Sequence, residues 1–332
     1  MLKTYSYTGP LKKYIEGFIK QKRTQGYSYE FEAYILQKFD EYCIQNKVSE
    51  TDISKESLKK WMTLRESESK SYLGQRISFI RQFLIYMNSL GISTYIPRNF
   101  STREVHVPHI LSDAEITAFF QQADSYKLLP TYQHHVMPVV FSRLAVEYQI
   151  IFRLIYCCGL RNSEACNLSV KDVDHENGVI TIIHSKGDKD RLVYLSDDMN
   201  QLLTKYLDKL KNEFNCHSQW VFPGRNPQDH LPKTSVDRKF NEFWNETPYA
   251  DICDKKPTVH SFRHSFVVKR MNKWMEQGID LNVMMVYLSK YLGHRGRAES
   301  FYYYHQVDSA FRIIRQKDKR SVNAIPEVPD ND

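Results

Sequence analysis

Apolar residues in the first ninety positions recur at intervals of three and four, the period of an amphipathic α-helix. This pattern predicts four helices, the second from about Ser28 to Asn46 and the third capped by Ser54. Gly26 and Gly91 stand where the first and the fourth helix are expected to end. The residues predicted to face inward are Leu11, Tyr14, Ile15, Phe18, Ile19, Phe31, Ile35, Phe39, Tyr42, Trp61, Leu64, Ile77, Ile80, Leu84 and Met87.

The helical pattern stops at Pro97, and no periodicity returns before Pro108. Ser112 and Glu115 then have the spacing of a capping box, in which two side chains satisfy free amide groups at a helix N-terminus. A length of 332 residues also suits two domains better than one. We therefore predict a helical domain at 1–97, a linker at 98–109, a second domain at 110–318 and a flexible tail at 319–332.

The second domain is expected to combine helices with a small β-sheet. Residues 179–184 form a β-branched run, Gly187-Asp188 is a turn signal, and residues 191–195 have the pattern of a returning strand, which together predict a hairpin. Residues 260–274 give the clearest helical pattern. The predicted fold class is thus mainly α with a small antiparallel β-sheet. The segment 125–141 contains two prolines and indicates no function.

The composition excludes several classes of protein. A chain that is 42% hydrophobic and 26% charged is typical of a soluble globular protein. Its longest apolar run, residues 139–160, is interrupted by Arg143, Glu147 and Arg153, so no membrane span is expected. No secretory core follows Met1, which favours the cytoplasm. The six cysteines contain no C-x-x-C pair and are expected to be buried free thiols.

The formal net charge of +7 is concentrated in the first domain. Residues 1–105 contain 17 Lys and Arg against 11 Asp and Glu. A basic small domain is what a polyphosphate partner would select. Solvated lysine-rich helix faces give the same surplus, so the charge agrees with a nucleic-acid partner without establishing one.

Four short segments carry the side chains that phosphodiester chemistry requires. Breaking such a bond needs a nucleophile, a proton acceptor, a proton donor and positive charge on the phosphate. Guanidinium groups suit the last task because their planar fork donates two parallel hydrogen bonds and stays charged. The segments are Gly159-Leu160-Arg161-Asn162-Ser163-Glu164, Ser185-Lys186-Gly187-Asp188-Lys189-Asp190-Arg191, His260-Ser261-Phe262-Arg263, and Leu292-Gly293-His294 followed by Tyr303 and His305.

In this order and at these spacings, the segments resemble the tyrosine recombinase family, also called the phage integrase family. Its members cut and rejoin DNA strands through a 3′-phosphotyrosine. The resemblance implies that Tyr303 is the nucleophile, because it follows His294 by nine residues and precedes His305 by two. Tyr302 and Tyr304 are its rivals. The resemblance also implies that Lys186 protonates the departing 5′ oxygen, with Lys189 as the competing candidate.

The remaining motif residues take further roles from the same resemblance. Arg161 and Arg263 are expected to clamp the phosphate oxygens, and His294 to donate a hydrogen bond to one of them. His260 lies one helical turn from Arg263 and resembles the family's proton acceptor. Residues expected to orient or support these groups are Glu164, His264 and His305.

The resemblance extends to the helical first domain, which is similar to the core-binding, or SAM-like, domain of the family. Its expected DNA-binding residues are Lys12, Lys13, Lys20, Arg76 and Arg81. The implied partner is double-stranded DNA, bound by a homotetramer on two duplexes, with accessory DNA-bending proteins as candidate partners. A C-terminal segment containing Ala310, Phe311, Ile313 and Ile314 is expected to dock on a neighbouring protomer or to pack in cis.

No cofactor is expected, since the phosphotyrosine keeps the bond energy and no step needs a metal or ATP. His106 and His109 have the spacing of ligands on a helix, but Pro108 between them argues against that helix. The predicted function is site-specific DNA strand cleavage and rejoining by the integrase or transposase of a mobile element. The alternatives are a relaxing enzyme like a type IB topoisomerase, a DNA-binding protein with a degenerate site, and a metal-dependent nuclease.

Overall fold

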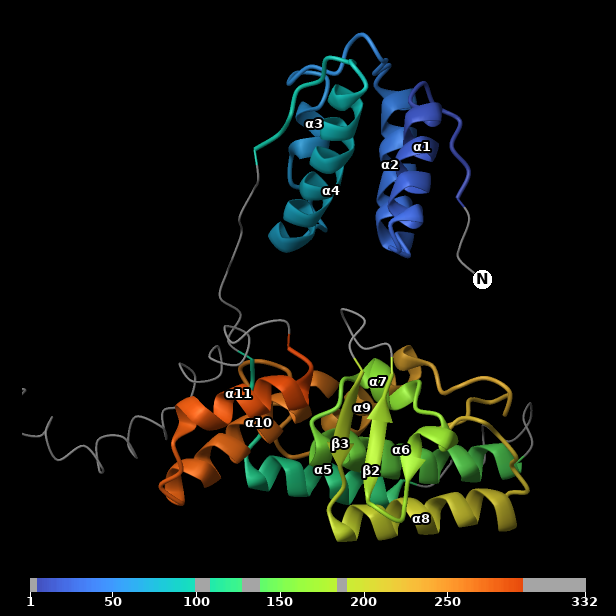
Figure 1. The fold of residues 1–332 in the computed structure, drawn as a ribbon, viewed down its shortest axis with the longest axis vertical. Coiled ribbons are helices and arrows are strands. Elements are labelled where there is room, and N and C mark those ends of the chain that lie inside the picture. The colour runs from blue at the N-terminus through green and yellow to red at the C-terminus, as the bar shows by residue number, and fades with distance from the viewer. Residues whose placement is uncertain (1–4, 99–107, 127–137, 184–189, 295–332) are drawn as a thin grey trace, which may run out of the picture. The chain divides into compact units, whose positions relative to one another are not determined.

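The computed structural model describes residues 5–98, 108–126, 138–183 and 190–294 (Figure 1). The chain divides into two compact units, Met1–His106 and Val107–Asp332, each with a hydrophobic core of its own. The described elements are helical except for one three-stranded antiparallel sheet, which confirms the predicted fold class. Within these ranges no helix combines the length and the apolar character needed to cross a bilayer.

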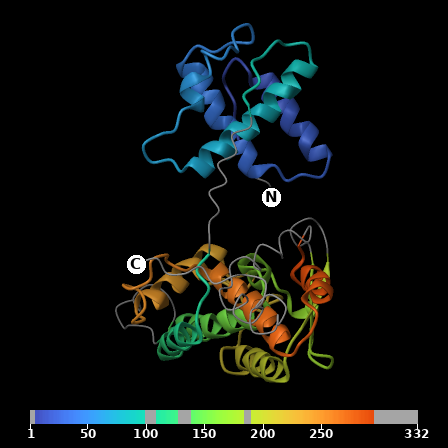
Figure 2. The ribbon, with the colours of Figure 1, turned by 90° about the vertical axis from the view of Figure 1, so that its left-hand side faces the viewer.

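The helices of the N-terminal unit pack against one another (Figure 2), and the core between them is rich in aromatic residues. The rings of Phe18, Phe39, Trp61 and Phe83 are buried there, with Phe39 edge-on to Trp61 at 5.1 Å between centroids. The inward faces predicted for the first and the fourth helix are confirmed. The helices are α1 (Lys12–Thr24), α2 (Glu30–Gln45), α3 (Lys59–Met62) and α4 (Lys70–Ser89).

Two positions predicted to face inward are on the surface instead. Phe31 is 44% exposed, and its ring packs edge-on against the ring of Phe79 at 5.9 Å. Leu64 is 43% exposed because α3 is a single turn that ends at Met62. Ser54 caps a turn before α3 and not the helix itself, since its hydroxyl accepts the Ser57 amide at 3.1 Å.

Arg76 was predicted to bind DNA, and this prediction is wrong. Its side chain is 1% exposed and donates to the Glu68 carboxylate at 2.8 Å from Nε and 2.7 Å from Nη2. The guanidinium also donates to the carbonyls of Trp61 and Thr63 and lies over the Trp61 ring. Arg76 therefore ties α4 to the segment around α3. It offers nothing to a DNA backbone.

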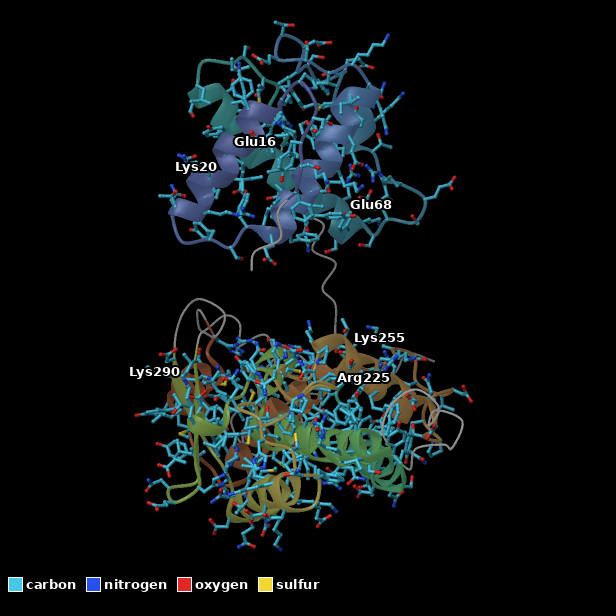
Figure 3. The ribbon with its side chains drawn as sticks, turned by 90° about the vertical axis from the view of Figure 1, so that its right-hand side faces the viewer. Glu16, Lys20, Glu68, Arg225, Lys255 and Lys290 are labelled. Carbon is cyan, nitrogen blue, oxygen red and sulfur yellow. The ribbon has the colours of Figure 1, made fainter. Side chains whose placement is uncertain are left out.

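The other predicted DNA-binding residues of this unit keep more contact with solvent. Lys12, Lys13 and Lys20 are exposed, and Arg81 is half-buried. Figure 3 shows Lys20 near Glu16 on α1, while Lys12 pairs with Glu16 at 3.8 Å and Lys13 with Glu50 at 3.3 Å. The three lysines remain candidates for DNA contact.

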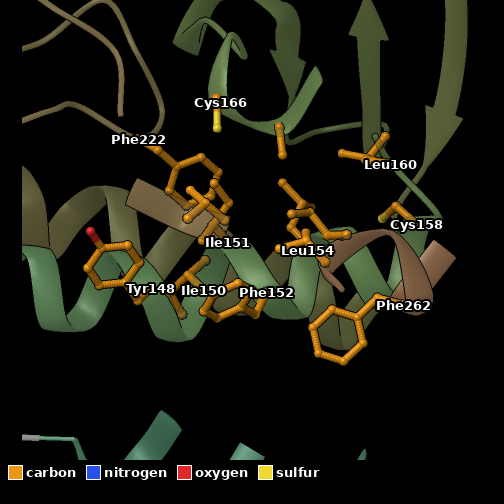
Figure 4. Packing of buried hydrophobic residues seen from close by; sticks show 14 of the residues in the cluster. Tyr148, Ile150, Ile151, Phe152, Leu154, Cys158, Leu160, Cys166, Phe222 and Phe262 are labelled. Atoms are coloured by element: carbon orange, nitrogen blue, oxygen red, sulfur yellow. The ribbon is translucent and has the colours of Figure 1, made fainter. Parts of the chain in front are cut away.

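The second unit is built around α6 (Pro138–Cys158), whose residues Ile150, Ile151, Phe152 and Leu154 lie in the hydrophobic core (Figure 4). Arg143 and Glu147, which interrupt the apolar run in the sequence, are buried and pair with each other. Arg143 also donates to the Gly224 carbonyl at 2.6 Å. The helices of this unit are α5 (Asp113–Ser125), α6 (Pro138–Cys158), α7 (Asn162–Cys166), η2 (Val170–Asp172), α8 (Asp197–Asn212), α9 (Lys233–Asn245), α10 (Val259–Glu276) and α11 (Leu281–Leu292).

The sheet is formed by β1 (Val173–Asp174), β2 (Val179–Ile182) and β3 (Arg191–Tyr194), in the order β1-β2-β3. Ile182 lies opposite Arg191 in an antiparallel register, which confirms the predicted hairpin strands. The predicted capping box of Ser112 and Glu115 and the predicted helix over 260–274 are also confirmed. The prediction that all six cysteines are buried is wrong for two of them, because Cys157 is exposed and Cys253 is half-buried.

Candidate active site

A sharp turn between α6 and α7 sets the first arginine of the site. Gly159 has a φ of +63°, and a Cβ there would lie 2.5 Å from the Phe266 ring, so only glycine fits this turn. Arg161 is the N-cap residue of α7, and Glu164 is the third residue of that helix. The Glu164 carboxylate accepts the Arg161 amide at 2.8 Å, which is half of a capping box. The turn thus fixes the backbone positions of Arg161 and Glu164.

The carboxylate of Glu164 lies at the centre of three guanidinium groups. It accepts one hydrogen bond from Arg161 Nη1 at 2.7 Å and two from Arg191, at 2.9 and 2.7 Å. Arg263 Nη1 is 3.9 Å from the same carboxylate. Burial alone would raise the pKa of Glu164, but the hydrogen bonds and charge of Arg191 and the hydrogen bonds from Arg161 lower it to about 2. Glu164 is therefore ionised at neutral pH.

The C-terminal end of α11 holds the same three arginines from the other side. Arg191 Nε donates to the Tyr291 carbonyl at 2.7 Å, Arg263 Nη2 to Leu292 at 2.7 Å, and Arg161 Nη2 to Gly293 at 3.0 Å. The last carbonyls of a helix have no partner within it, and this end of the helix dipole attracts cations. Three consecutive carbonyls thus position three guanidinium groups. We call the three arginines and Glu164 together the arginine centre.

Arg263 is the most buried member of the arginine centre. Its side chain is 1% exposed, and Nη1 donates to the Gly159 carbonyl at 2.8 Å. It therefore links α10 to the α6–α7 turn and to the end of α11. Arg161 is more accessible, with 18% of its side chain exposed.

His260 lies one turn before Arg263 on α10, and its ring packs edge-on against His264 at 4.5 Å between centroids. The pKa of His260 is lowered to about 4 by desolvation and by the charges of Arg263 and Arg161. His260 is an exposed residue, and the neighbouring charges of Arg263 and Arg161 disfavour its protonated form. The imidazole is therefore neutral at neutral pH and able to accept a proton.

His294 follows directly after Gly293, whose φ of +64° ends α11. The side chain is half-buried. Burial and the charges of Arg263, Arg161 and Arg191 lower the pKa of His294 to about 3. A neutral imidazole carries one N–H donor and one acceptor nitrogen, so His294 has the chemistry to hydrogen-bond an oxygen atom near the arginine centre.

The structure thus brings together Arg161, Glu164, His260, Arg263 and His294. Other predicted site residues lie outside the described residues: Lys186, Tyr303 and His305, with the rivals Lys189, Tyr302 and Tyr304, and the segment 310–314. The sequence motifs assigned no site role to Arg191. The sequence does mark Arg191, because this residue ends the K-G-x-K-x-R run of 186–191. Its partners Glu164 and Tyr291 are distant from it in the sequence, so the run gives no sign of these contacts.

One group in the described part of the chain has the composition of a metal site. Ligand atoms of His109, Glu115 and Cys253 all lie within 4.8 Å of one another. The contacts have another explanation, since Glu115 Oε1 is 2.8 Å from His109 Nε2 and Oε2 accepts from the Ser112 amide and hydroxyl. No local pattern predicts this group, because Cys253 comes from a distant segment. We assign these contacts to hydrogen bonding around the capping box.

Comparison with known proteins agrees with this arrangement. Residues 121–310 match the model of the phage integrase family. The chain is 26% identical over 289 residues to a tyrosine recombinase of Pseudothermotoga lettingae, covering 83% of this chain and 87% of that protein. It is also 26% identical over 271 residues to the tyrosine recombinase XerD of Rhizobium meliloti, covering 80% of each.

Two solved structures share the fold. One is the XerH site-specific recombinase bound to palindromic difH substrate, with a TM-score of 0.62 and 19% identity over 86% of this chain and 78% of that one. The other is the Tn1549 transposon integrase in complex with transposon right end DNA, with a TM-score of 0.62 and 14% identity over 91% and 98%. The family model covers more than half of the sequence. The chain therefore belongs to the phage integrase family, the tyrosine-type site-specific recombinases of DNA.

Proposed function

We propose that this chain cuts and rejoins DNA through a 3′-phosphotyrosine on Tyr303, with the arginine centre binding the phosphate that is cut. The observation that supports this most is the surplus of positive charge in the centre. Three guanidinium groups meet one carboxylate, while the two neighbouring histidines are neutral at neutral pH. Two net positive charges suit a pentacoordinate phosphorane, on which negative charge accumulates in the transition state.

Arg161 is the arginine that we assign to direct contact with the phosphate. A guanidinium has five N–H donors, and the contacts described for Arg161 use two of them. The described contacts of Arg161 therefore leave N–H donors that can bind a phosphate oxygen. Arg263 is buried, so we assign to it the positive charge beneath the phosphate and the orientation of α10.

His260 is assigned as the proton acceptor for the attacking hydroxyl of Tyr303. Its neutral ring is able to take this proton, and a bound phosphate would offset the arginine charges that lower its pKa. As the tyrosine oxygen bonds to phosphorus, the bond to the 5′ oxygen breaks, and Lys186 is assigned to give that oxygen a proton. His294 is assigned a hydrogen bond to a phosphate oxygen. A 5′ hydroxyl from another strand reverses the step, so neither metal nor ATP takes part.

The roles of the domains are part of the same proposal. The helical segment 1–97 would bind the duplex through Lys12, Lys13, Lys20 and Arg81. A linker at 98–109 would join it to a catalytic domain at 110–318, followed by a tail at 319–332. We propose a homotetramer on two duplexes, assisted by DNA-bending proteins, as the integrase or transposase of a mobile element. Glu164, His264 and His305 would support the reacting groups.

A nicked duplex that traps the covalent intermediate tests the proposed function. Its sequence would first be selected for binding from a random pool, and the reaction would be run in EDTA. We expect a covalent protein–DNA adduct with the wild type and none with Tyr303→Phe. Binding without an adduct would favour the degenerate DNA-binding protein, and cleavage abolished by EDTA would favour the metal-dependent nuclease. Relaxation of a supercoiled plasmid without exchange between two duplexes would favour the topoisomerase-like enzyme.

A further inference from the structure

Arg191 is a third guanidinium beside Arg161 and Arg263, and the proposed function gives it no role. It donates to both oxygens of Glu164, at 2.9 and 2.7 Å, and its Nε donates to the Tyr291 carbonyl at 2.7 Å. Such bidentate pairs are the strongest arginine–carboxylate contacts. The side chain is 7% exposed, so its charge faces the interior of the site.

Glu164 would weaken the site if Arg191 were absent. Its carboxylate accepts a single side-chain hydrogen bond from Arg161, and Arg263 is 3.9 Å away. A buried negative charge at these distances opposes the attraction that both guanidinium groups exert on a phosphate, because the low dielectric of the interior screens it poorly. The carboxylate is still needed, since it fixes Arg161 through the backbone amide and the side chain.

We propose that Arg191 is a positioning residue that neutralises Glu164, so that the charges of Arg161 and Arg263 stay available to the scissile phosphate. The proposal rests on the proposed function above. The geometry favours it over a purely structural role, because the fork of Arg191 covers both carboxylate oxygens while Arg161 contacts one of them through its side chain. Arg191 also links β3 to the end of α11, which positions the other two arginines.

The experiment is single-turnover cleavage of the nicked duplex by Arg191→Gln, Glu164→Gln and the double variant. Arg191→Gln leaves Glu164 charged without its bidentate partner, and we expect cleavage to fall by about 10- to 100-fold. The double variant has the same net charge as the wild type, so we expect it to cleave about 10-fold faster than Arg191→Gln. Arg191→Lys keeps the charge but loses the fork, and its rate should lie between those of the wild type and Arg191→Gln.

A matched control removes a guanidinium elsewhere in the same unit. Arg153 pairs with Asp124 at 2.7 Å and lies outside the arginine centre, so Arg153→Gln changes the net charge equally and should cleave at nearly the wild-type rate. Thermal unfolding of each variant checks the fold. If Arg191→Gln does not fold, the comparison is between Glu164→Gln and the double variant, whose rates should agree within about 3-fold because no charge remains to be neutralised.

The recovery in the double variant separates a charge role from a packing role. A packing role predicts that the two losses accumulate, so a double variant slower than Arg191→Gln would overturn the proposal. Arg191→Lys as slow as Arg191→Gln, or Arg191→Gln as fast as Arg153→Gln, would overturn it as well. Failure of the proposed function has a different signature, since the wild type itself would then form no adduct in EDTA.

Discussion

Both units of this protein bury an arginine against a glutamate, and the two clusters differ in their charge balance. In the N-terminal unit, Glu68 is the only carboxylate that pairs with Arg76 among the described residues, and the other contacts of Arg76 are backbone carbonyls and the Trp61 ring. In the second unit, Glu164 meets Arg161, Arg191 and Arg263. The first cluster is neutral and closed, while the second keeps surplus positive charge beside two neutral histidines. The surplus of cations over anions, and not a buried arginine as such, is therefore the feature that supports the proposed phosphate site.

The largest expected effect on cleavage comes from removing one arginine of the arginine centre. Arg161→Ala should lower cleavage of the nicked duplex by at least about 10²-fold, because it removes a preorganised donor to the transition state. Duplex affinity should change little, since many other phosphate contacts determine it. Single-turnover cleavage and a binding titration measure the two effects, with Arg153→Ala as the control. A parallel loss of binding and cleavage would mean that Arg161 only positions the DNA.

Changes to the neutral pair of Arg76 and Glu68 should affect the stability of the protein and not its catalysis. Arg76→Ala leaves Glu68 buried without its partner, and we expect unfolding to become easier by about 3 kcal/mol. Replacing both Arg76 and Glu68 by methionine should cost less than this single change, since no charge is then left unpaired. Urea denaturation followed by circular dichroism measures both. Lys59→Ala, in the exposed pair with Glu56, is the control and should change little.

A smaller effect is expected at the exposed lysines of α1. Lys13→Gln and Lys20→Gln should each reduce the slope of log affinity against log salt by about one, because each removes a phosphate contact and its released counterion. Duplex binding titrated from low to moderate salt gives this slope. The double variant with Arg76 and Glu68 both replaced by methionine is the comparison, because it leaves no buried charge unpaired, and it should leave the slope unchanged. Equal slopes for all these variants would remove α1 from the DNA interface.

The smallest effect concerns the response of His294 to pH. Folding lowers its pKa from 6.5 to about 3, so the unfolded chain takes up this proton first as the pH falls. The wild type should therefore lose stability as the pH falls from 6.5 toward 5. His294→Asn should lose less over the same interval, as measured by thermal unfolding. Identical pH profiles would show that burial and the surplus charge do not lower the pKa of His294.

Local signals in the sequence predict much of this fold. The hairpin strands, the Ser112 cap and the helix from Val259 are confirmed because each depends on a short-range pattern. The prediction that Arg76 binds DNA is wrong, although its position three residues after Leu73 places it on the apolar face of α4. Periodicity shows where such a residue points, but it gives no sign of its partner Glu68. The inward position predicted for Phe31 is wrong because an aromatic residue that packs on another ring at the surface has the same place in the apolar pattern as a core residue.

The candidate site was predictable where it follows a motif and not where it depends on tertiary contacts. Arg161, Glu164, His260, Arg263 and His294 lie together as the motifs suggest. The part that motifs do not give is the binding of the three arginines to consecutive carbonyls at the end of α11. Those hydrogen bonds join residues that only the folded chain brings together, so no spacing rule reports them.

The most direct test of the proposed chemistry maps the attachment of DNA on the trapped adduct. Trypsin would release the peptide of residues 298–312, which contains Tyr302, Tyr303 and Tyr304. Fragmentation of the nuclease-trimmed peptide in a mass spectrometer then locates the nucleotide. We predict a 3′-linked nucleotide on Tyr303, formed at a rate that Arg161→Ala lowers by at least about 10²-fold. A nucleotide on any other residue, or an adduct formed equally fast without Arg161, would contradict the proposed mechanism.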